Sequence, residues 1–141
     1  MKKYVIILVA LSSVLLISSA IGNQKQPSGY ILEHENDIAV TEPGPHKGGG
    51  NTIAHKFFKN ASTSKLQFTK RILKPGSAIG YHLQKEEEIY YIVSGAGEMS
   101  MNGEIFTVQA GDAILTHAGS SHGLKQTGKN DLVLIINYER K

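Results

Sequence analysis

Cysteine is absent from all 141 residues of the chain. Disulfides, thiolate catalysis, thiolate metal sites and a lipid-modified cysteine anchor are therefore excluded. Any chemistry must come from histidine, carboxylate, tyrosine or lysine side chains, or from a bound metal. The chain also lacks a strong net charge, because its formal charge is only +3. It has no basic run with interleaved aromatic residues, so the sequence gives no electrostatic basis for binding nucleic acid.

A convincing helical period is also lacking. Short apolar segments instead follow one another from residue 53 to residue 138, split by Gly, Asn, Asp, Ser and Pro. In the clearest of them, Met99 and Met101 alternate with polar residues up to Asn102-Gly103, and both methionines are expected to fill the core. Asn-Gly between two such segments predicts a tight hairpin, since both turn residues need φ > 0. Many short strands joined by turns predict an all-β fold, either a sandwich or a closed barrel.

The first residues, "MKKYVIILVALSSVLLISSA", combine a basic start, a long apolar stretch and small residues at the end. This layout predicts a secretory signal peptide over residues 1–22, cleaved after Ala20 or Gly22, and hence a secreted or periplasmic protein. The alternative is an uncleaved anchor, since the apolar stretch approaches the ~20 residues that span a bilayer. Cleavage after Gly22 removes two lysines and leaves 119 residues of formal charge +1 with no membrane attachment. That length suffices for one small barrel.

Residues 23–53 are expected to form a leader, an arm and a Gly/Pro-rich loop, and residues 54–141 a barrel. The loop "TEPGPHKGGGN" holds two prolines and four glycines, which argues against any helix there. Two interpretations of its His46 and Lys47 stay open. The loop is either a plain connection or a cover over the barrel mouth, where successive N–H groups form an anion-binding nest.

The segment "HLQKEEEIYYIVSG", residues 82–95, places three glutamates before an apolar, aromatic run. Charged side chains so close to a buried strand are costly unless something compensates them, and a bound cation would do so. Residues two apart on a strand share a face, so His82 and Gln84 project together. A second turn-strand unit, "GDAILTHAGSSHGLKQ", contains His122, which antiparallel packing can bring opposite His82.

These two segments resemble the two motifs of the cupin superfamily. The first motif is matched in spacing by Gly76, His82, Gln84, Glu88 and Gly95, with Gln84 where the second histidine normally stands. The second is matched by Gly111, His117, Gly119, His122 and Gln126, with His117 at a usual proline and Gln126 at a usual asparagine. The resemblance implies one double-stranded β-helix barrel, often a homodimer, with a divalent metal in its cavity.

Carried over residue by residue, the resemblance implies metal ligands at His82, Glu88 and His122, with Gln84 at the divergent fourth position. Two imidazoles and one carboxylate suit non-haem iron, and manganese, nickel, cobalt or zinc are tolerable. The amide of Gln84 either binds the metal weakly or stays outside its coordination shell and holds a metal-bound water. The alternative is a decayed site in a metal-free barrel.

Neighbouring residues allow further interpretations. Glu86 and Glu87 are either alternative ligands or a solvated acidic turn balanced by Lys85. His117 is either catalytic or a solvent-facing residue at a strand end.

The tyrosines near the first motif have two possible roles, one structural and one catalytic. Tyr81, Tyr90 and Tyr91 are expected in the barrel wall or core. One of these phenols, with Tyr81 the first choice, is also a candidate proton donor in the cavity.

Two functions follow from this site. The leading hypothesis is an exported metal-dependent enzyme acting on a small oxygen-rich molecule, as a dioxygenase, isomerase, lyase or decarboxylase. The competing one is a non-catalytic module that binds a carbohydrate or organic acid. One fold hosts many activities, so the reaction does not follow from the fold.

Overall fold

The computed structural model describes residues 29–61 and 64–140. The predicted signal peptide lies outside these residues. The chain divides into a first unit, Met1–Tyr30, and a second unit, Ile31–Lys141, which contains every strand found among the described residues. Within the described residues, no helix has both the length and the apolar character needed to cross a membrane.

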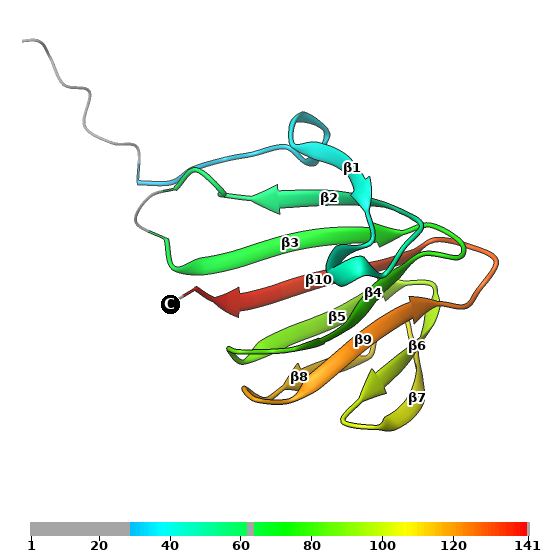
Figure 1. Cartoon of the computed structure of the whole chain (residues 1–141). Helices are drawn as coiled ribbons and strands as arrows, with labels where there is room; N and C mark the ends of the chain where they lie inside the picture. The colour runs from blue at the N-terminus through cyan, green and yellow to red at the C-terminus, as the bar shows by residue number, and fades with distance from the viewer. Residues whose placement is uncertain (1–28, 62–63, 141) are drawn as a thin grey trace, which may run out of the picture. The chain divides into compact units, whose positions relative to one another are not determined.

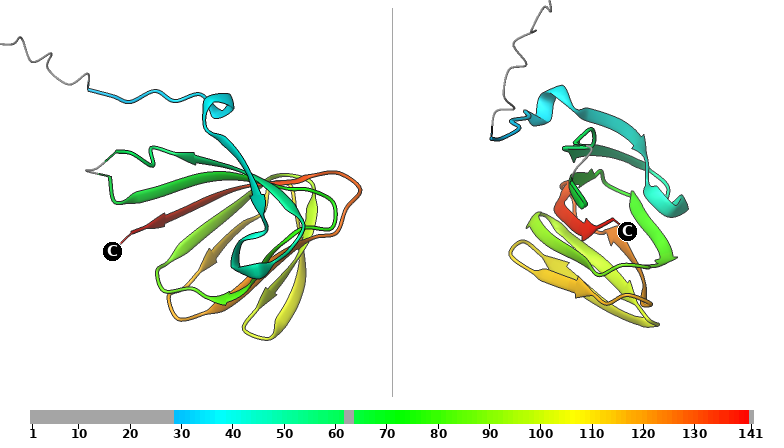
Figure 2. Two further views of the ribbon diagram at one scale, coloured as in Figure 1. Left: turned by 45° about the horizontal axis from the view of Figure 1, so that its top comes forward. Right: turned by 90° about the vertical axis from the view of Figure 1, so that its left-hand side faces the viewer.

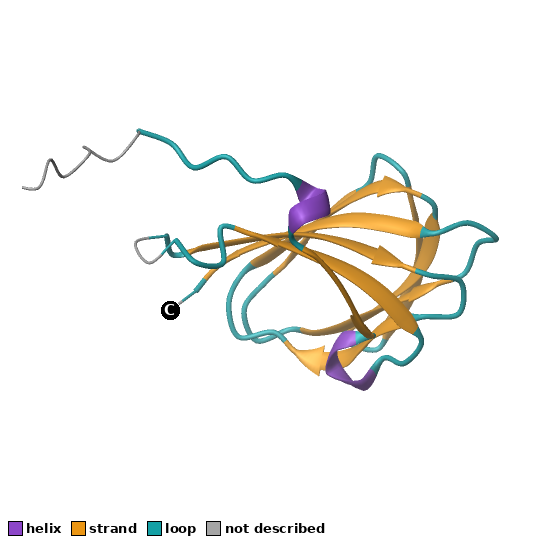
Figure 3. Cartoon of the chain, turned by 90° about the horizontal axis from the view of Figure 1, so that it is seen from above, coloured by secondary structure: helices purple, strands orange, loops and turns teal. Residues whose placement is uncertain are grey.

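The regular secondary structure of the described chain is almost entirely strand (Figures 1 and 3), which confirms the all-β prediction. The strands are β1 (Ala39–Pro43), β2 (Asn51–Phe57), β3 (Leu66–Leu73), β4 (Ala78–Leu83), β5 (Glu88–Ser94), β6 (Ala96–Met101), β7 (Glu104–Gln109), β8 (Ala113–Thr116), β9 (Ser121–Gln126) and β10 (Leu132–Glu139). Two short 3-10 helices are η1 (Glu35–Asp37) and η2 (Pro45–Lys47). The second of these lies in the Gly/Pro-rich loop but is a single turn in which His46 has a non-helical φ of 52°, so the loop holds no regular helix, as expected.

The strands form two antiparallel sheets that curve around a common interior (Figure 2). One sheet has six strands in the order β1-β2-β3-β10-β5-β8, and the other has four in the order β4-β9-β6-β7. Strands far apart in the sequence, such as β3 and β10, pair with each other. Long-range pairing therefore holds the six-stranded sheet together. This arrangement confirms the jelly-roll prediction.

The hairpin between β6 and β7 forms where Asn-Gly predicted it. Met101 pairs with Glu104, and the two turn residues Asn102 and Gly103 have φ of 48° and 90°. Met99 on the preceding strand is fully buried in the core, as expected.

The apolar core fills one end of the interior and leaves room at the other. Along β10 the inward side chains of Leu132 and Leu134 are fully buried in the core, while Ile136 and Tyr138 line a cavity. Each fully buried leucine contributes roughly 1.5–3 kcal/mol to folding. The core therefore provides a rigid base on which the cavity is built.

Strand β1 extends the six-stranded sheet by pairing with β2, so the segment expected as an arm before residue 54 includes a strand. The following loop then packs against β4 in the other sheet. This close approach needs Gly80, because a Cβ there would collide with the backbone carbonyl of His46. Of the two readings of the loop, the structure therefore shows the one in which it packs over the barrel.

Candidate metal centre

Three potential metal ligands converge from three strands. His82 lies near the end of β4 and is directly opposite His122 of β9 in the strand register, as the sequence suggested. Glu88 is the first residue of β5, in the six-stranded sheet. Their ligating atoms all lie within 4.8 Å of one another. Glu88 and His122 are buried, and His82 is half-buried.

The spacing of two of these atoms suits a shared ion. Nε2 of His122 lies 3.2 Å from Oε2 of Glu88. Two ligands about 2.1 Å from one metal are roughly 3.0 Å apart in octahedral geometry and roughly 3.4 Å apart in tetrahedral geometry. Neither of these two buried atoms makes a hydrogen bond within the described structure, although they are close. A metal ion would satisfy both.

Hydrogen bonds on the far side of each imidazole orient the two histidines. Nδ1 of His82 lies 2.8 Å from the carbonyl oxygen of Gly80. Because a carbonyl only accepts, this nitrogen donates, and Nε2 of the neutral ring keeps a free lone pair. Nδ1 of His122 lies 3.2 Å from Oγ1 of Thr116. A hydroxyl both donates and accepts, so this contact orients the ring and is compatible with a proton on Nδ1 and a free lone pair on Nε2. The orientation of both rings therefore fits a divalent metal.

Tyr90 supports the carboxylate of the cluster. It lies two residues after Glu88 on β5 and is 2% exposed. Burial raises its pKa well above 10, and the negative charge of Glu88 and a hydrogen bond to that carboxylate raise it further. The phenol therefore keeps its proton, and its hydrogen bond helps to hold Glu88 in place.

A cavity of about 380 Å³ adjoins the cluster. His82, Glu88 and Tyr90 lie in its wall together with Gln84, which is 7% exposed. The backbone of Gln84 is fixed on both sides, because its N–H donates to Ser120 and its carbonyl accepts from Gly119 at 2.8 Å each. The structure thus brings the divergent fourth motif residue to the same cavity as His82 and Glu88. Small-molecule sites have volumes from roughly 300 Å³ upward.

His46, from the Gly/Pro-rich loop, packs flat on one member of the cluster. Its ring stacks on that of His82, with centroids 3.5 Å apart and planes 5° apart. Burial lowers the pKa of His46, and the neighbouring His82 lowers it further, so its imidazole is neutral near pH 7. The loop therefore supplies part of the cavity wall, which the sequence offered only as an alternative.

Two residues considered as acids or bases lie elsewhere. Tyr81 is 56% exposed and is not in the cavity wall. It is adjacent to His82 on a strand and so faces the opposite side. The His117 side chain is 73% exposed and lies 3.2 Å from Glu87, on the surface. The structure brings neither Tyr81 nor His117 to the metal centre.

The acidic turn between β4 and β5 lies near the cavity but contributes no ligand to the cluster. The strand that would have aligned Glu86 with Glu88 is interrupted between Leu83 and Glu88. Glu86 is half-buried and lines the cavity, while Glu87 is exposed. Neither belongs to the cluster of possible metal ligands.

Sequence reasoning missed a polar wall on the six-stranded sheet. The inward side chains of β3 in the cavity are Gln67, Thr69 and Arg71, and Lys56 of β2 and Tyr138 of β10 join them. A signal was present in "LQFTKRIL", where polar residues alternate at period two. Such a strand buries its polar face only if that face lines a polar cavity.

Comparisons with known proteins agree with this geometry. The Cupin domain family matches residues 70–138. An "Oxalate-binding protein" of Thermotoga maritima is 39% identical over 112 residues, which cover 77% of this chain and 92% of that protein. The crystal structure of a predicted oxalate decarboxylase from Thermotoga maritima superposes with a TM-score of 0.71 at 30% identity, over 79% of this chain and 100% of that one.

A more distant relative is a 5-nitrosalicylic acid 1,2-dioxygenase of Bradyrhizobium sp. It is 26% identical over 69 residues, which cover 49% of this chain. The match spans only 33% of the dioxygenase. These relatives include a small-molecule-binding protein and an enzyme, which agrees with a cavity that takes a small molecule.

Proposed function

Because the chain belongs to the cupin superfamily, we propose that His82, Glu88 and His122 hold one divalent transition metal and that the cavity binds a small oxygen-rich organic molecule. Oxalate is the first ligand to test, since a relative covered over 92% of its length is named for binding it. The observation that carries the proposal is that Nε2 of His122 and Oε2 of Glu88 are both buried, lack hydrogen-bond partners among the described residues and lie 3.2 Å apart.

The side chains around the site have distinct roles in this proposal. A bound divalent metal would act as a Lewis acid towards oxygen donors of the ligand. Gln84 offers an amide that orients a water or a ligand oxygen. Tyr138 lines the cavity, and burial together with the charge of Glu88 raises its pKa, so its phenol is a hydrogen-bond donor.

Binding without turnover is the form of this function that the cavity supports best. The acid/base residues considered from the sequence, His117 and Tyr81, lie outside the cavity, and the phenols of Tyr90 and Tyr138 hold their protons. An enzyme is the second candidate, and one observation favours it. The neutral imidazole of His46 lies in the cavity wall and is able to accept a proton.

The test begins with metal analysis of protein purified without air and supplied with iron, manganese, nickel, cobalt or zinc. About one ion per chain is expected, and His122→Ala should lose it while keeping the fold. Calorimetry with oxalate should then show binding to the loaded protein only. Incubation with oxalate, followed by assays for oxygen uptake, formate and carbon dioxide, distinguishes an enzyme from a binding module. A folded wild-type protein without stoichiometric metal would overturn the proposal.

Export of the mature chain is a further part of this proposal, supported by the signal-like layout of residues 1–22. Expression in a host with a secretory pathway should yield an exported protein that begins near Ile21 or Asn23. Intact mass spectrometry measures this directly. A protein found only inside the cell with Met1 retained would contradict it.

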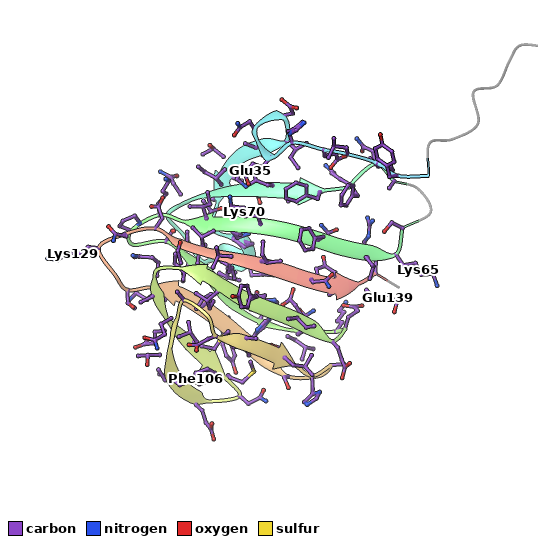
Figure 4. All side chains as sticks on the ribbon, turned by 180° about the vertical axis from the view of Figure 1, so that it is seen from behind. Glu35, Lys65, Lys70, Phe106, Lys129 and Glu139 are labelled. Carbon is purple, nitrogen blue, oxygen red and sulfur yellow. The ribbon has the colours of Figure 1, made fainter. Side chains whose placement is uncertain are left out.

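A homodimer is also proposed, through the outer face of the six-stranded sheet (Figure 4). Strand β5 exposes Ile89, Tyr91 and Val93 there by 45–46%, and Leu115 of β8, paired with Ile89, is 51% exposed. A contiguous apolar patch of this kind marks an interaction surface, and a twofold contact would cover it with the same patch of a second copy. Sedimentation should give a dimer for the wild type and a monomer for Leu115→Glu; a wild-type monomer would refute the proposal.

A further inference from the structure

Arg71 is a buried cation in the wall of the cavity. It lies on β3 and is only 5% exposed. Its Nη1 donates to Oγ1 of Thr52 at 2.9 Å, and its Nη2 donates to Oε1 of Glu42 at 2.8 Å. Its Nε–H is buried and has no hydrogen-bond partner among the described residues. A buried charged group with an unmade hydrogen bond is costly, so the presence of this cation in the cavity wall calls for an explanation.

The charges beside Arg71 do not balance. Glu42 also accepts from Nζ of Lys56 at 2.9 Å, so one carboxylate serves two cations. Burial raises the pKa of Glu42, but the hydrogen bonds and charges of Lys56 and Arg71 outweigh this effect and lower it below 4.5. Glu42 is therefore ionised at neutral pH, and the cluster of Arg71, Lys56 and Glu42 keeps one net positive charge. Both cations of the cluster line the cavity, whereas Glu42 does not.

A metal ion bound at the cluster would give the cavity a second positive charge. A divalent ion held by two neutral imidazoles and the carboxylate of Glu88 has a net charge of +1. Its ligands come from β4, β9 and β5, whereas Lys56 and Arg71 come from β2 and β3. The two positive centres thus open onto one cavity from different strands.

We infer that Arg71 and Lys56 form an anion subsite that, together with the metal centre, selects a carboxylate ligand. In this subsite the guanidinium of Arg71 and the ammonium of Lys56, both in the cavity wall, supply the positive charge and the hydrogen-bond donors that a carboxylate takes. The inference rests on the proposed function, because it names the chemical class of ligand for the same cavity. A charge-assisted hydrogen bond is about twice as strong as a neutral one, so the ionised ligand should be clearly preferred.

The sharpest variant is Arg71→Lys, because it keeps a positive charge for Glu42 but removes the planar guanidinium and its several donors. Calorimetry on metal-loaded protein should show at least tenfold weaker oxalate binding than wild type, with metal stoichiometry unchanged. Wild type should prefer oxalate over its neutral diamide, oxamide, by at least tenfold. Glu42→Gln should tighten oxalate binding, since it removes a negative charge beside the two cations. Lys74→Gln is a matched control that removes a cation paired elsewhere, with Asp131, and should change nothing.

The outcomes separate this inference from the function it rests on. Wild type that binds metal and oxalate, with Arg71→Lys or oxamide binding equally well, overturns the anion subsite and leaves the metal-dependent function intact. Wild type that binds no metal overturns the function itself. If Arg71→Lys fails to fold, the oxalate-to-oxamide preference and the response of Glu42→Gln still decide. No preference and weaker binding in Glu42→Gln would together indicate a purely structural ion-pair network.

Discussion

The hydroxyl of Thr116 offers a direct test of the metal centre. Thr116 is 1% exposed and His122 is fully buried, and their side chains meet at 3.2 Å. Thr116→Val keeps the shape of the side chain and removes the oxygen that would accept from Nδ1 of His122 when metal is bound to Nε2. The other imidazole nitrogen, Nε2, is the one that would bind metal.

The loss should fall on the metal-bound state. Without metal, His122 of the variant is able to move its proton to Nε2 and donate it to Glu88, 3.2 Å away. With metal on Nε2, the proton must stay on Nδ1, where it has lost its partner. An unsatisfied buried donor costs about 1–3 kcal/mol. At about 1.36 kcal/mol per factor of ten, the metal dissociation constant should rise roughly 5- to 150-fold.

Competition titration against a chromogenic chelator measures this change. The matched control is Thr52→Val, which makes the same substitution at a fully buried threonine that bonds Arg71 rather than a histidine. The control should lower the free energy of unfolding but leave metal affinity within about twofold of wild type. If Thr116→Val also stays within twofold, or if Thr52→Val loses as much, the assignment of Nε2 of His122 as a ligand is refuted.

Three other predictions concern neighbouring residues. Gln84→His should bind metal more tightly by at least ~1 kcal/mol, because an imidazole is a better ligand than an amide; unchanged affinity in the same titration would contradict this. Gly80→Ala should weaken metal binding by displacing His46 from His82, whereas Gly128→Ala, whose Cβ would make only ordinary contacts at 3.8 Å or more, should not; equal affinities would refute the role of the loop. The lowered pKa of Glu42 stabilises the fold above pH 4.5, and this stabilisation is lost as pH falls below that value. Urea titrations should therefore show a shallower acid dependence for Glu42→Gln, and parallel curves would argue against it.

The parts of the fold that were predicted depend on local chemistry. Asn102-Gly103 identifies its hairpin because few residues tolerate positive φ. The pairing of His82 with His122 was only a possibility from the sequence, and the structure shows it. Tyr81, the predicted proton donor, is not in the cavity wall, for a reason visible in the sequence. Tyr81 and His82 are consecutive on a strand, so their side chains point to opposite faces. The missed residues depend on distant packing. His46 reaches the site only because its loop packs against β4.

The polar wall on β3 was also predictable only in part, because local sequence sets one aspect of it and distant packing the other. Alternation along β3 indicates that Gln67, Thr69 and Arg71 share a face, but not which face is inside. That choice is made by pairing with β10, which comes at the far end of the chain. The interruption between β4 and β5 likewise could not be read from three consecutive glutamates, because nothing in their composition says where pairing stops.

The distribution of ligands over both sheets has a mechanical consequence. His82 and His122 belong to the four-stranded sheet and Glu88 to the six-stranded one, at the end of the interior where apolar packing gives way to a cavity. One ion would thus cross-link the two sheets at the end of the interior where a cavity replaces apolar packing between them. Loss of the metal would weaken the contact between the sheets at this end. The melting temperature should therefore fall when metal is removed, and it measures metal occupancy even when no ligand or product is followed.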